Sequence, residues 1–176
     1  MNDSTITVRR VAAHEAADCV PPLADVLIDC VEGGASVSFM LPLARERALA
    51  FWRGVADGVQ RGDRILLVAQ DEAGRIVGTV QLVTALPENQ PHRADVAKML
   101  VHRRARRQGL AERLMRAAED TARASGKTLL VLDTVTGGDA ERLYARLGWQ
   151  RVGSIPDYAL FPRGGTCATT YFYRAL

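Results

Sequence analysis

A cluster of arginines that ends at a glycine is the part of the sequence whose residue types most directly suggest chemistry. The stretch RRARRQGLAERL, Arg103 to Leu114, carries four arginines in its first five positions. From Leu110 onward, apolar residues recur at helical spacing, so a helix is expected to begin close to Gly109. The first turn of a helix leaves amide N–H groups unpaired, and the helix dipole favours negative charge there. The segment therefore predicts a phosphate-binding site, at which a glycine allows close backbone approach.

The same segment could instead form a solvated basic turn in front of a surface helix. The charge of the whole chain is consistent with anionic ligands, because the formal net charge is +3 and the isoelectric point is near 9.0. This balance falls short of the strongly basic character of a dedicated nucleic-acid binder. We therefore expect a small anionic ligand and no nucleic-acid partner.

The hydrophobic pattern predicts an α/β fold that positions this segment between a strand and a helix. The expected order is strand, two helices, three strands, helix, strand, helix and two strands. The expected strands are 5–11, 64–70, 75–84, 94–102, 128–133, 148–154 and 169–176, and the expected helices are 21–33, 42–60, 110–126 and 139–148. The strand TLLVLD does not alternate and is expected to be buried on both faces. The result is one domain over 1–176, with a mixed, mostly antiparallel central sheet flanked by helices.

Several simple classes of protein are not favoured by the sequence. The cysteines and histidines, Cys19, Cys30, Cys167, His14, His92 and His102, are scattered and lack metal-ligand spacing. Buried free thiols, surface or capping histidines and no metal are therefore expected. No apolar run reaches the length of a membrane span, and the N-terminus lacks the apolar region of a signal peptide. A cytoplasmic protein without a membrane partner is predicted.

The arginine segment also resembles the acetyl-CoA motif of the GNAT superfamily of acetyltransferases. Arg106-Arg107-Gln108-Gly109-Leu110-Ala111 matches the family pattern [Q/R]-x-x-G-x-[G/A], and Tyr144 to Trp149 matches its second marker, Tyr-x-x-x-Gly-aromatic. The resemblance covers essentially the whole chain. It implies the GNAT fold and acetyl-CoA as co-substrate, with the pyrophosphate on the amides of Gln108 to Ala111. The 3′-phosphate would lie near one or more of the arginines, and the pantetheine arm would pair with Met99, Leu100 and Val101.

Three further stretches look like the tabtoxin-resistance branch of this family, which acetylates an amino-acid-like β-lactam toxin. They are Glu32 to Met40, Arg93 to Val101 and Leu132 to Gly138. This likeness implies N-acetylation of a small amino-acid-like amine, such as a toxin or an antibiotic. The branch has glutamate at the position of Asp95, so the carboxylate is kept here with a reach shorter by one methylene.

Acetylation of an amine requires a carboxylate or another base, because an alkyl ammonium at pH 7 lies about 4 kcal/mol from its neutral form. Asp95 lies near the start of the strand before the motif, and Asp133 ends TLLVLD, so both carboxylates could face the site where these strands separate. One would anchor the ammonium and the other would accept its proton, and either could instead be a surface charge. In the family, the equivalent of Tyr144 protonates the departing thiolate; otherwise it would be a core tyrosine. Lys98 is expected to be a solvated surface lysine.

Acceptor selection is expected from the segment between the first two helices and from the loop around Tyr158. Gly34, Ser36 and Phe39 would line this pocket together with Tyr158. The alternative is that the glycines cap a helix and Phe39 belongs to the core. Rival functions are acetylation of proteins or peptides, which would need an open groove, and a module that binds acetyl-CoA or nucleic acid without transfer. The protein is expected to be a monomer or a homodimer.

Overall fold

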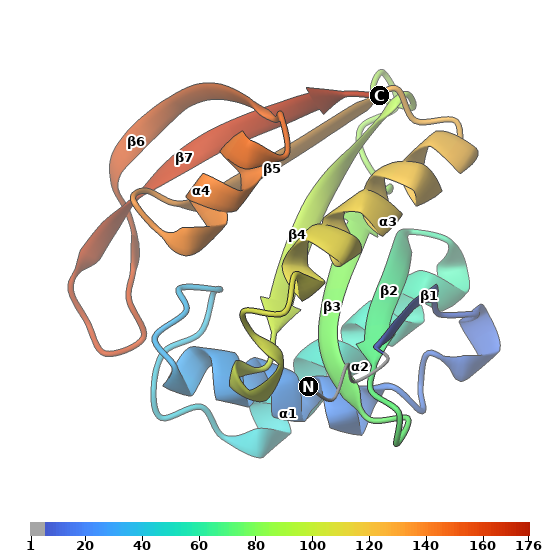
Figure 1. Cartoon of the computed structure of the whole chain (residues 1–176). Coiled ribbons are helices and arrows are strands. Elements are labelled where there is room, and N and C mark those ends of the chain that lie inside the picture. The colour runs from blue at the N-terminus through green and yellow to red at the C-terminus, as the bar shows by residue number, and fades with distance from the viewer. Residues whose placement is uncertain (1–5) are drawn as a thin grey trace.

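The computed structural model describes residues 6–176, which form one seven-stranded sheet with helices on both faces (Figure 1). The strands are β1 (Thr7–Arg10), β2 (Arg64–Gln70), β3 (Ile76–Val83), β4 (Arg93–Val101), β5 (Leu129–Val135), β6 (Gln150–Leu160) and β7 (Thr166–Ala175). The helices are α1 (Val20–Glu32), α2 (Arg45–Arg61), α3 (Leu110–Ala124) and α4 (Asp139–Arg146), with short 3₁₀ turns η1 (Ala13–Glu15) and η2 (Arg103–Ala105). The spatial order is β1-β2-β3-β4-β5-β7-β6, and every neighbouring pair is antiparallel except β4 and β5. This confirms the predicted mixed, mostly antiparallel sheet.

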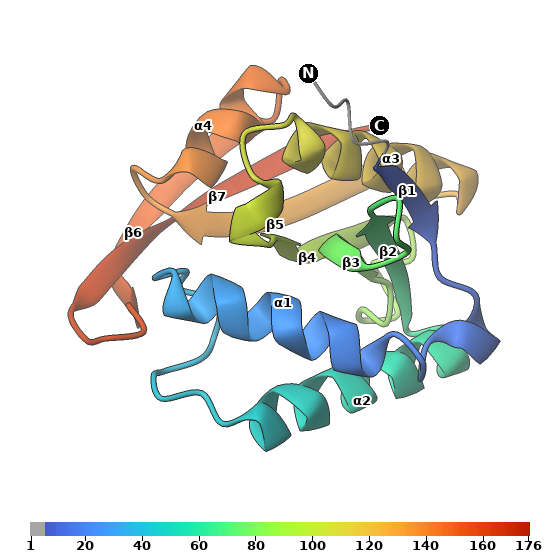
Figure 2. The same cartoon turned by 60° about the horizontal axis from the view of Figure 1, so that its bottom comes forward.

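Two hydrophobic clusters lie on opposite faces of the sheet (Figure 2). Helices α3 and α4 cover one face, where Leu114 and Met115 of α3 are fully buried. Helices α1 and α2 cover the other face, where Leu27 and Trp52 are fully buried. Because α1 and α2 pack on β2, β3 and β4, they leave the same face of β5 uncovered.

The largest differences from the expected boundaries concern α2, β6 and β7. Helix α2 begins at Arg45 and not at Pro42, because Ala44 has extended backbone angles and is its N-cap. Strand β6 continues to Leu160, and β7 begins already at Thr166. The prediction that TLLVLD is buried on both faces was wrong: Leu130 and Leu132 are buried while Asp133 is exposed, since no helix covers the second face there. Thr5, at the start of the first expected strand, lies outside the described residues.

Strands β4 and β5 separate soon after they pair, and this divergence is visible as a V in Figure 1. Their parallel pairing covers only Arg93–Asp95 on β4 and Leu129–Val131 on β5. We call the region between the later parts of the two strands the splay. A β-bulge interrupts β4 in the splay, because three steps from Ala97 to Leu100 face two steps on β3. Lys98 lies in this bulge with a φ of +49°, and bulges of this kind re-aim side chains.

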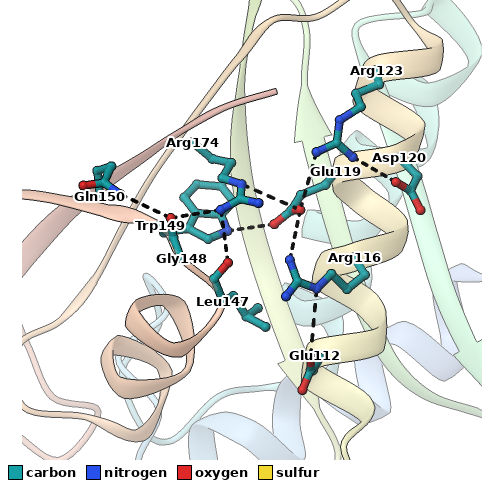
Figure 3. Close-up of polar contacts among 10 residues, drawn as sticks. All are labelled: Glu112, Arg116, Glu119, Asp120, Arg123, Leu147, Gly148, Trp149, Gln150 and Arg174. Carbon is teal, nitrogen blue, oxygen red and sulfur yellow. Dashed lines mark hydrogen bonds and ion pairs between the residues drawn. The ribbon is translucent and has the colours of Figure 1, made fainter.

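A buried carboxylate ties α3 to the C-terminal part of the sheet (Figure 3). Glu119 of α3 is 2% exposed and accepts a 2.9 Å hydrogen bond from the indole Nε1 of Trp149. Arg174 of β7 places its Nε 3.9 Å from the same carboxylate and donates to the carbonyls of Leu147 and Gly148. The cofactor-motif helix, the end of α4 and the last strand are therefore joined through one network.

The structure also bears on the expectations for cysteines, histidines, membrane spans and metal sites. All three cysteines are free and buried, as expected. His102 accepts a hydrogen bond at its Nδ1 from the amide of Arg104, which is a capping role. Within residues 6–176, no helix combines the length and apolarity needed to cross a membrane. The same residues contain no group of three or more His, Cys, Asp or Glu side chains arranged to hold a metal ion.

Candidate active site

The loop between β4 and α3 has the backbone geometry of an anion site. Gly109 is the N-cap of α3 with a φ of +70°, and Arg107 also has a positive φ of +59°. The backbone amide of Arg113 donates to the carbonyl of Gly109 at 3.1 Å, whereas the amides of the first turn before it have no helical partner. A Cβ built on Gly109 would meet no atom within 4 Å, so the space beside Gly109 is open. The loop can accept phosphate oxygens there.

Only some of the arginines in this segment are available for such an anion. Arg103 is engaged with Asp29, to which it donates from its amide at 2.8 Å and its Nε at 2.9 Å. Arg106 donates from Nε to the carbonyl of Val101 at 3.0 Å. Within the described part of the chain, the exposed guanidinium groups of Arg104 and Arg107 make no hydrogen bond or ion pair. The side chains available to bind an anion are therefore those of Arg104 and Arg107. Arg106 instead stabilises the loop through its hydrogen bond to Val101.

The splayed edge of β4 exposes alternate backbone groups. The amide of His102 donates to Val77 on β3 at 2.9 Å, so strand alternation turns the backbone groups of Val101 toward the splay. The Val101 carbonyl accepts from Arg106, which agrees with this direction. Leu100 instead pairs with Thr79 on β3. Of the three residues predicted to pair with the pantetheine arm, Val101 faces the splay, Leu100 does not, and Met99 lies in the bulge, where strand alternation does not apply.

The two candidate carboxylates lie on the face of the sheet opposite α3 and α4. Leu130 and Leu132 belong to the cluster under α3 and α4, so Asp133 points to the other face. Ala94 and Val96 likewise belong to that cluster, so Asp95 also points to the other face. The Thr169 hydroxyl on β7 lies 2.8 Å from Asp133 Oδ2 and orients this carboxylate.

The environments of the two carboxylates differ. Asp95 forms an ion pair with Arg93, two residues away on the same strand. Asp133 makes no ion pair with any described residue, and its only side-chain partner is the hydroxyl of Thr169. An unpaired carboxylate keeps its lone pairs for a substrate, whereas Asp95 already uses one carboxylate oxygen on Arg93. The two aspartates, which the sequence analysis could not distinguish, therefore differ in their ion pairing.

Tyr144 approaches the splay from the opposite face, on α4. Its ring is 5% exposed and packs near Trp149 and Phe172, with centroids 6.0 Å away in each case. Burial, reinforced by the negative charge of Asp133, raises the pKa of Tyr144 well above the ordinary tyrosine value. No described residue forms a hydrogen bond with its hydroxyl. Tyr144 is therefore a core tyrosine, as the alternative expected, but its hydroxyl has no backbone carbonyl partner among the described residues.

Tyr171, a tyrosine next to the predicted Tyr158, was missed in the sequence analysis. Tyr171 on β7 pairs directly with Asp133 across the ladder and so shares its face. Its hydroxyl lies 3.0 Å from that of Tyr158, which is carried by an irregular part of β6. The hydrogen bond from Tyr158, with burial and the charge of Asp133, raises the pKa of Tyr171 to about 12. The i, i+2 spacing of Thr169 and Tyr171 signals a shared face, but which strand they pair with is not readable from the sequence.

Residues 33–44, which connect α1 to α2 and are called the 33–44 segment below, pack against the β6–β7 hairpin on this side of the sheet. Ser36 Oγ donates to the carbonyl of Leu160 at 2.7 Å, and the amide of Leu41 donates to the carbonyl of Pro162 at 2.9 Å. Phe39 packs edge-on against Phe51 of α2, with centroids 5.4 Å apart. Gly34 is exposed, with a φ of +93° after the end of α1. Ser36 and Phe39 thus build the segment, and the hydroxyl that reaches the splay side is that of Ser38.

Lys98 is not the solvated lysine that the sequence suggests. Its Nζ lies 3.1 Å from Ser38 Oγ and 5.5 Å from the centroid of the Phe51 ring. Burial lowers the pKa of Lys98, although the charge of Asp133 opposes this shift. The bulge in β4 directs this side chain under the 33–44 segment, and an irregularity of that kind leaves no signal in strand alternation.

Comparison with known proteins identifies the family of this chain. Residues 37–149 match the model of the acetyltransferase (GNAT) family, which covers both the phosphate loop and α4. The chain belongs to the GNAT acetyltransferase family. It is 37% identical over 130 residues to an uncharacterized N-acetyltransferase encoded in the hisH–hisA intergenic region of Azospirillum brasilense, which covers 73% of this chain and 74% of that protein. The GNAT resemblance seen in the sequence is thereby confirmed.

Solved structures show the same fold in GNAT-like proteins. An inferred acetyltransferase from Acinetobacter baylyi superposes with a TM-score of 0.82 at 16% identity, over 100% of this chain and 94% of that one. YncA from Salmonella typhimurium, an inferred acetyltransferase solved with acetyl-CoA, gives a TM-score of 0.76 at 19% identity, over 98% and 95% of the two chains. At these identities the likeness concerns the fold alone.

Family and geometry together identify the reaction class. The protein is an acetyl-CoA-dependent N-acetyltransferase. The open space before the α3 amides, the left-handed Gly109 and the free guanidinium groups of Arg104 and Arg107 fit the phosphates of this co-substrate. The groups that could bind the acceptor amine are those on the other face of the sheet, opposite α3 and α4.

Proposed function

We propose that this enzyme transfers the acetyl group of acetyl-CoA to the amine of a small amino-acid-like molecule by direct attack in a ternary complex. The observation that carries the proposal is the division of polar groups between the two faces of the splay. The phosphate loop and Tyr144 belong to the face of α3 and α4, whereas Asp95 and Asp133 belong to the opposite face. Two substrates could then approach the splay from opposite sides and meet there, which is the geometry that a single transfer step needs.

Acetyl-CoA supplies an activated thioester when bound. The free amides at Gly109 and Leu110, with Arg104 and Arg107, would hold its phosphates. The splay-facing backbone of Val101, together with Met99 beside it, would position its pantetheine arm. A backbone N–H of β4 that faces the splay can also stabilise the developing oxyanion. Such a donor contributes about 3 kcal/mol in other acyl transfers.

Asp133 is the better candidate for the base. Its carboxylate is oriented by Thr169 and makes no ion pair among the described residues, so it can accept a proton from the acceptor ammonium, directly or through water. Asp95 is paired with Arg93 through one carboxylate oxygen, and its other oxygen would help to anchor the amine end of the acceptor. The neutral amine then attacks the thioester carbonyl, so that the N–C bond forms as the C–S bond breaks.

Tyr144 would return a proton to the departing thiolate. Burial keeps its hydroxyl protonated at neutral pH, and no described residue competes for it. A tyrosine with a raised pKa remains a proton donor throughout the range in which the amine can be deprotonated. Tyr144 is therefore assigned the role of general acid.

The 33–44 segment favours a small acceptor over a peptide. It is fastened to the β6–β7 hairpin by the contacts of Ser36 and Leu41, and Phe39 and Phe51 lie behind it. A long peptide would require this segment to detach, whereas a small amine would not. Gly34, exposed after the end of α1, and Tyr158, whose hydroxyl lies 3.0 Å from that of Tyr171, would complete the acceptor pocket. A pocket of this kind would suit an acceptor similar to the toxins and antibiotics handled by the tabtoxin-resistance branch.

A thiol-release assay with acetyl-CoA and a panel of amines tests this proposal. The panel contains amino acids, β-lactam amino-acid analogues, aminoglycosides, polyamines and a lysine peptide. Turnover confined to amino-acid-like amines is the expected result. Preferential turnover of the peptide would overturn the closed-pocket assignment and favour a protein acetyltransferase.

A further inference from the structure

A lysine and an aspartate stand on the same side of the splay without pairing with each other or with any other ion. Lys98 and Asp133 share the face opposite α3 and α4, and neither forms an ion pair with another described residue. The negative charge of Asp133 is nevertheless close enough to act on Lys98. A buried charge is costly unless it is paired or hydrogen-bonded, so an unpaired lysine in a partly buried position calls for a partner.

The ammonium of Lys98 has spare hydrogen-bonding capacity. An ammonium offers three donors, and only one described acceptor, Ser38 Oγ at 3.1 Å, lies within hydrogen-bonding distance of Nζ. The Phe51 ring covers another side at 5.5 Å and binds a cation without using a directed hydrogen bond. At least one donor therefore remains for a ligand.

The backbone around this contact is held in sparsely populated conformations. Lys98 has a φ of +49° and Ser38 a φ of +80°, both in the left-handed region that residues with a Cβ rarely adopt. Such strain persists where surrounding structure over-determines it, and it clusters at ligand-binding positions. Here the two unusual conformations occur where Lys98, from the β4 bulge, meets Ser38 of the 33–44 segment.

We propose that Lys98, with Ser38, binds the carboxylate of the acceptor while Asp133 receives its amine. This inference rests on the proposed function, because it assigns the acceptor of the same site. It specifies the acceptor as a zwitterion whose reactive amine and carboxylate are a few bonds apart. A cation and an anion held apart on one face complement such a molecule, and neither charge is then left unpaired.

Matched acceptors that differ only at the carboxylate test the inference. Each amino acid that is turned over is compared with its methyl ester, its amide and its decarboxylated amine, with kcat and KM measured separately. The wild-type enzyme is expected to prefer the free acid by about 10- to 100-fold in kcat/KM, the range for one charge-assisted hydrogen bond. Most of this preference is expected in KM, because the contact is made equally in the ground state and the transition state.

Lys98→Met should remove the preference. Its kcat/KM for the free acid should fall by about 10- to 100-fold, with the activity toward the ester unchanged. Lys127→Met is the matched control, because Lys127 is the other lysine of the chain and donates to the carbonyl of Pro91 away from the splay.

Equal losses for acid and ester, or a preference that survives in Lys98→Met, would overturn the inference. Wild-type turnover of esters as good as that of acids would overturn it while leaving the proposed function intact, whereas no turnover of any amino-acid-like amine would overturn the proposed function itself.

Discussion

The indole nitrogen of Trp149 donates a 2.9 Å hydrogen bond to the buried carboxylate of Glu119, and this contact joins the helix of the phosphate loop to the end of α4. The Trp149 ring in turn packs beside Tyr144, and Arg174 approaches the same carboxylate from β7. The groups proposed for cofactor binding and for proton donation therefore share one structural support.

Replacement of Glu119 is expected to destabilise the fold strongly. Glu119→Leu removes the acceptor of the Trp149 indole and the carboxylate that lies 3.9 Å from Arg174 Nε, and removing one partner of a buried ion pair typically costs about 3–5 kcal/mol. Glu119→Gln keeps an oxygen for the indole and should cost less. Urea denaturation measures both, with Glu112→Gln on the exposed side of the same helix as a control expected within about 0.5 kcal/mol of wild type. A loss for Glu119→Leu as small as that of the control would contradict the assigned role of the network.

Gly109→Val is expected to abolish acetyl-CoA binding. The new side chain would project from the N-cap of α3, a residue with φ +70°, into the open space beside Gly109, where we expect the phosphates to approach the free amides. Gly62→Val is the matched control, since Gly62 ends α2 with a φ of +81° and also has no atom within 4 Å of an added Cβ. Both variants should lose about 1–3 kcal/mol of stability from backbone strain. Calorimetric titration with acetyl-CoA should detect binding only to the Gly62 variant, and equal affinities would place the phosphates elsewhere.

Tyr144→Phe is expected to lower kcat by about 10²-fold with little change in stability, because the lost hydroxyl has no partner among the described residues. The pH profile provides a second check. The acid must be protonated, and burial raises the pKa of Tyr144, so activity is lost only as pH rises through this raised value. The kcat of the wild type should therefore show no descending limb from this group below about pH 10. A limb near neutral pH that disappears in the phenylalanine variant would contradict the assignment.

The strong helical periodicity and the two sequence markers suffice to predict the order of elements, the phosphate loop and the sheet type. Helix α3, with Leu114 and Met115 buried, begins at Leu110 as its pattern indicates. The acceptor face was less predictable, because it depends on irregular backbone. The β4 bulge redirects Lys98, and the register of β7 against β5 brings Tyr171 opposite Asp133. Neither a bulge nor a register between distant strands can be read from local residue patterns.

The most direct test of the proposed mechanism is the turnover of Asp133→Asn at saturating acetyl-CoA and saturating acceptor. We expect kcat to fall by about 10²-fold or more, the usual effect of losing a general base, with the acetyl-CoA dissociation constant unchanged. Asp120→Asn, on the exposed surface of α3, serves as the control and should retain full activity. Wild-type turnover by Asp133→Asn would contradict the central claim that this carboxylate accepts the proton of the amine.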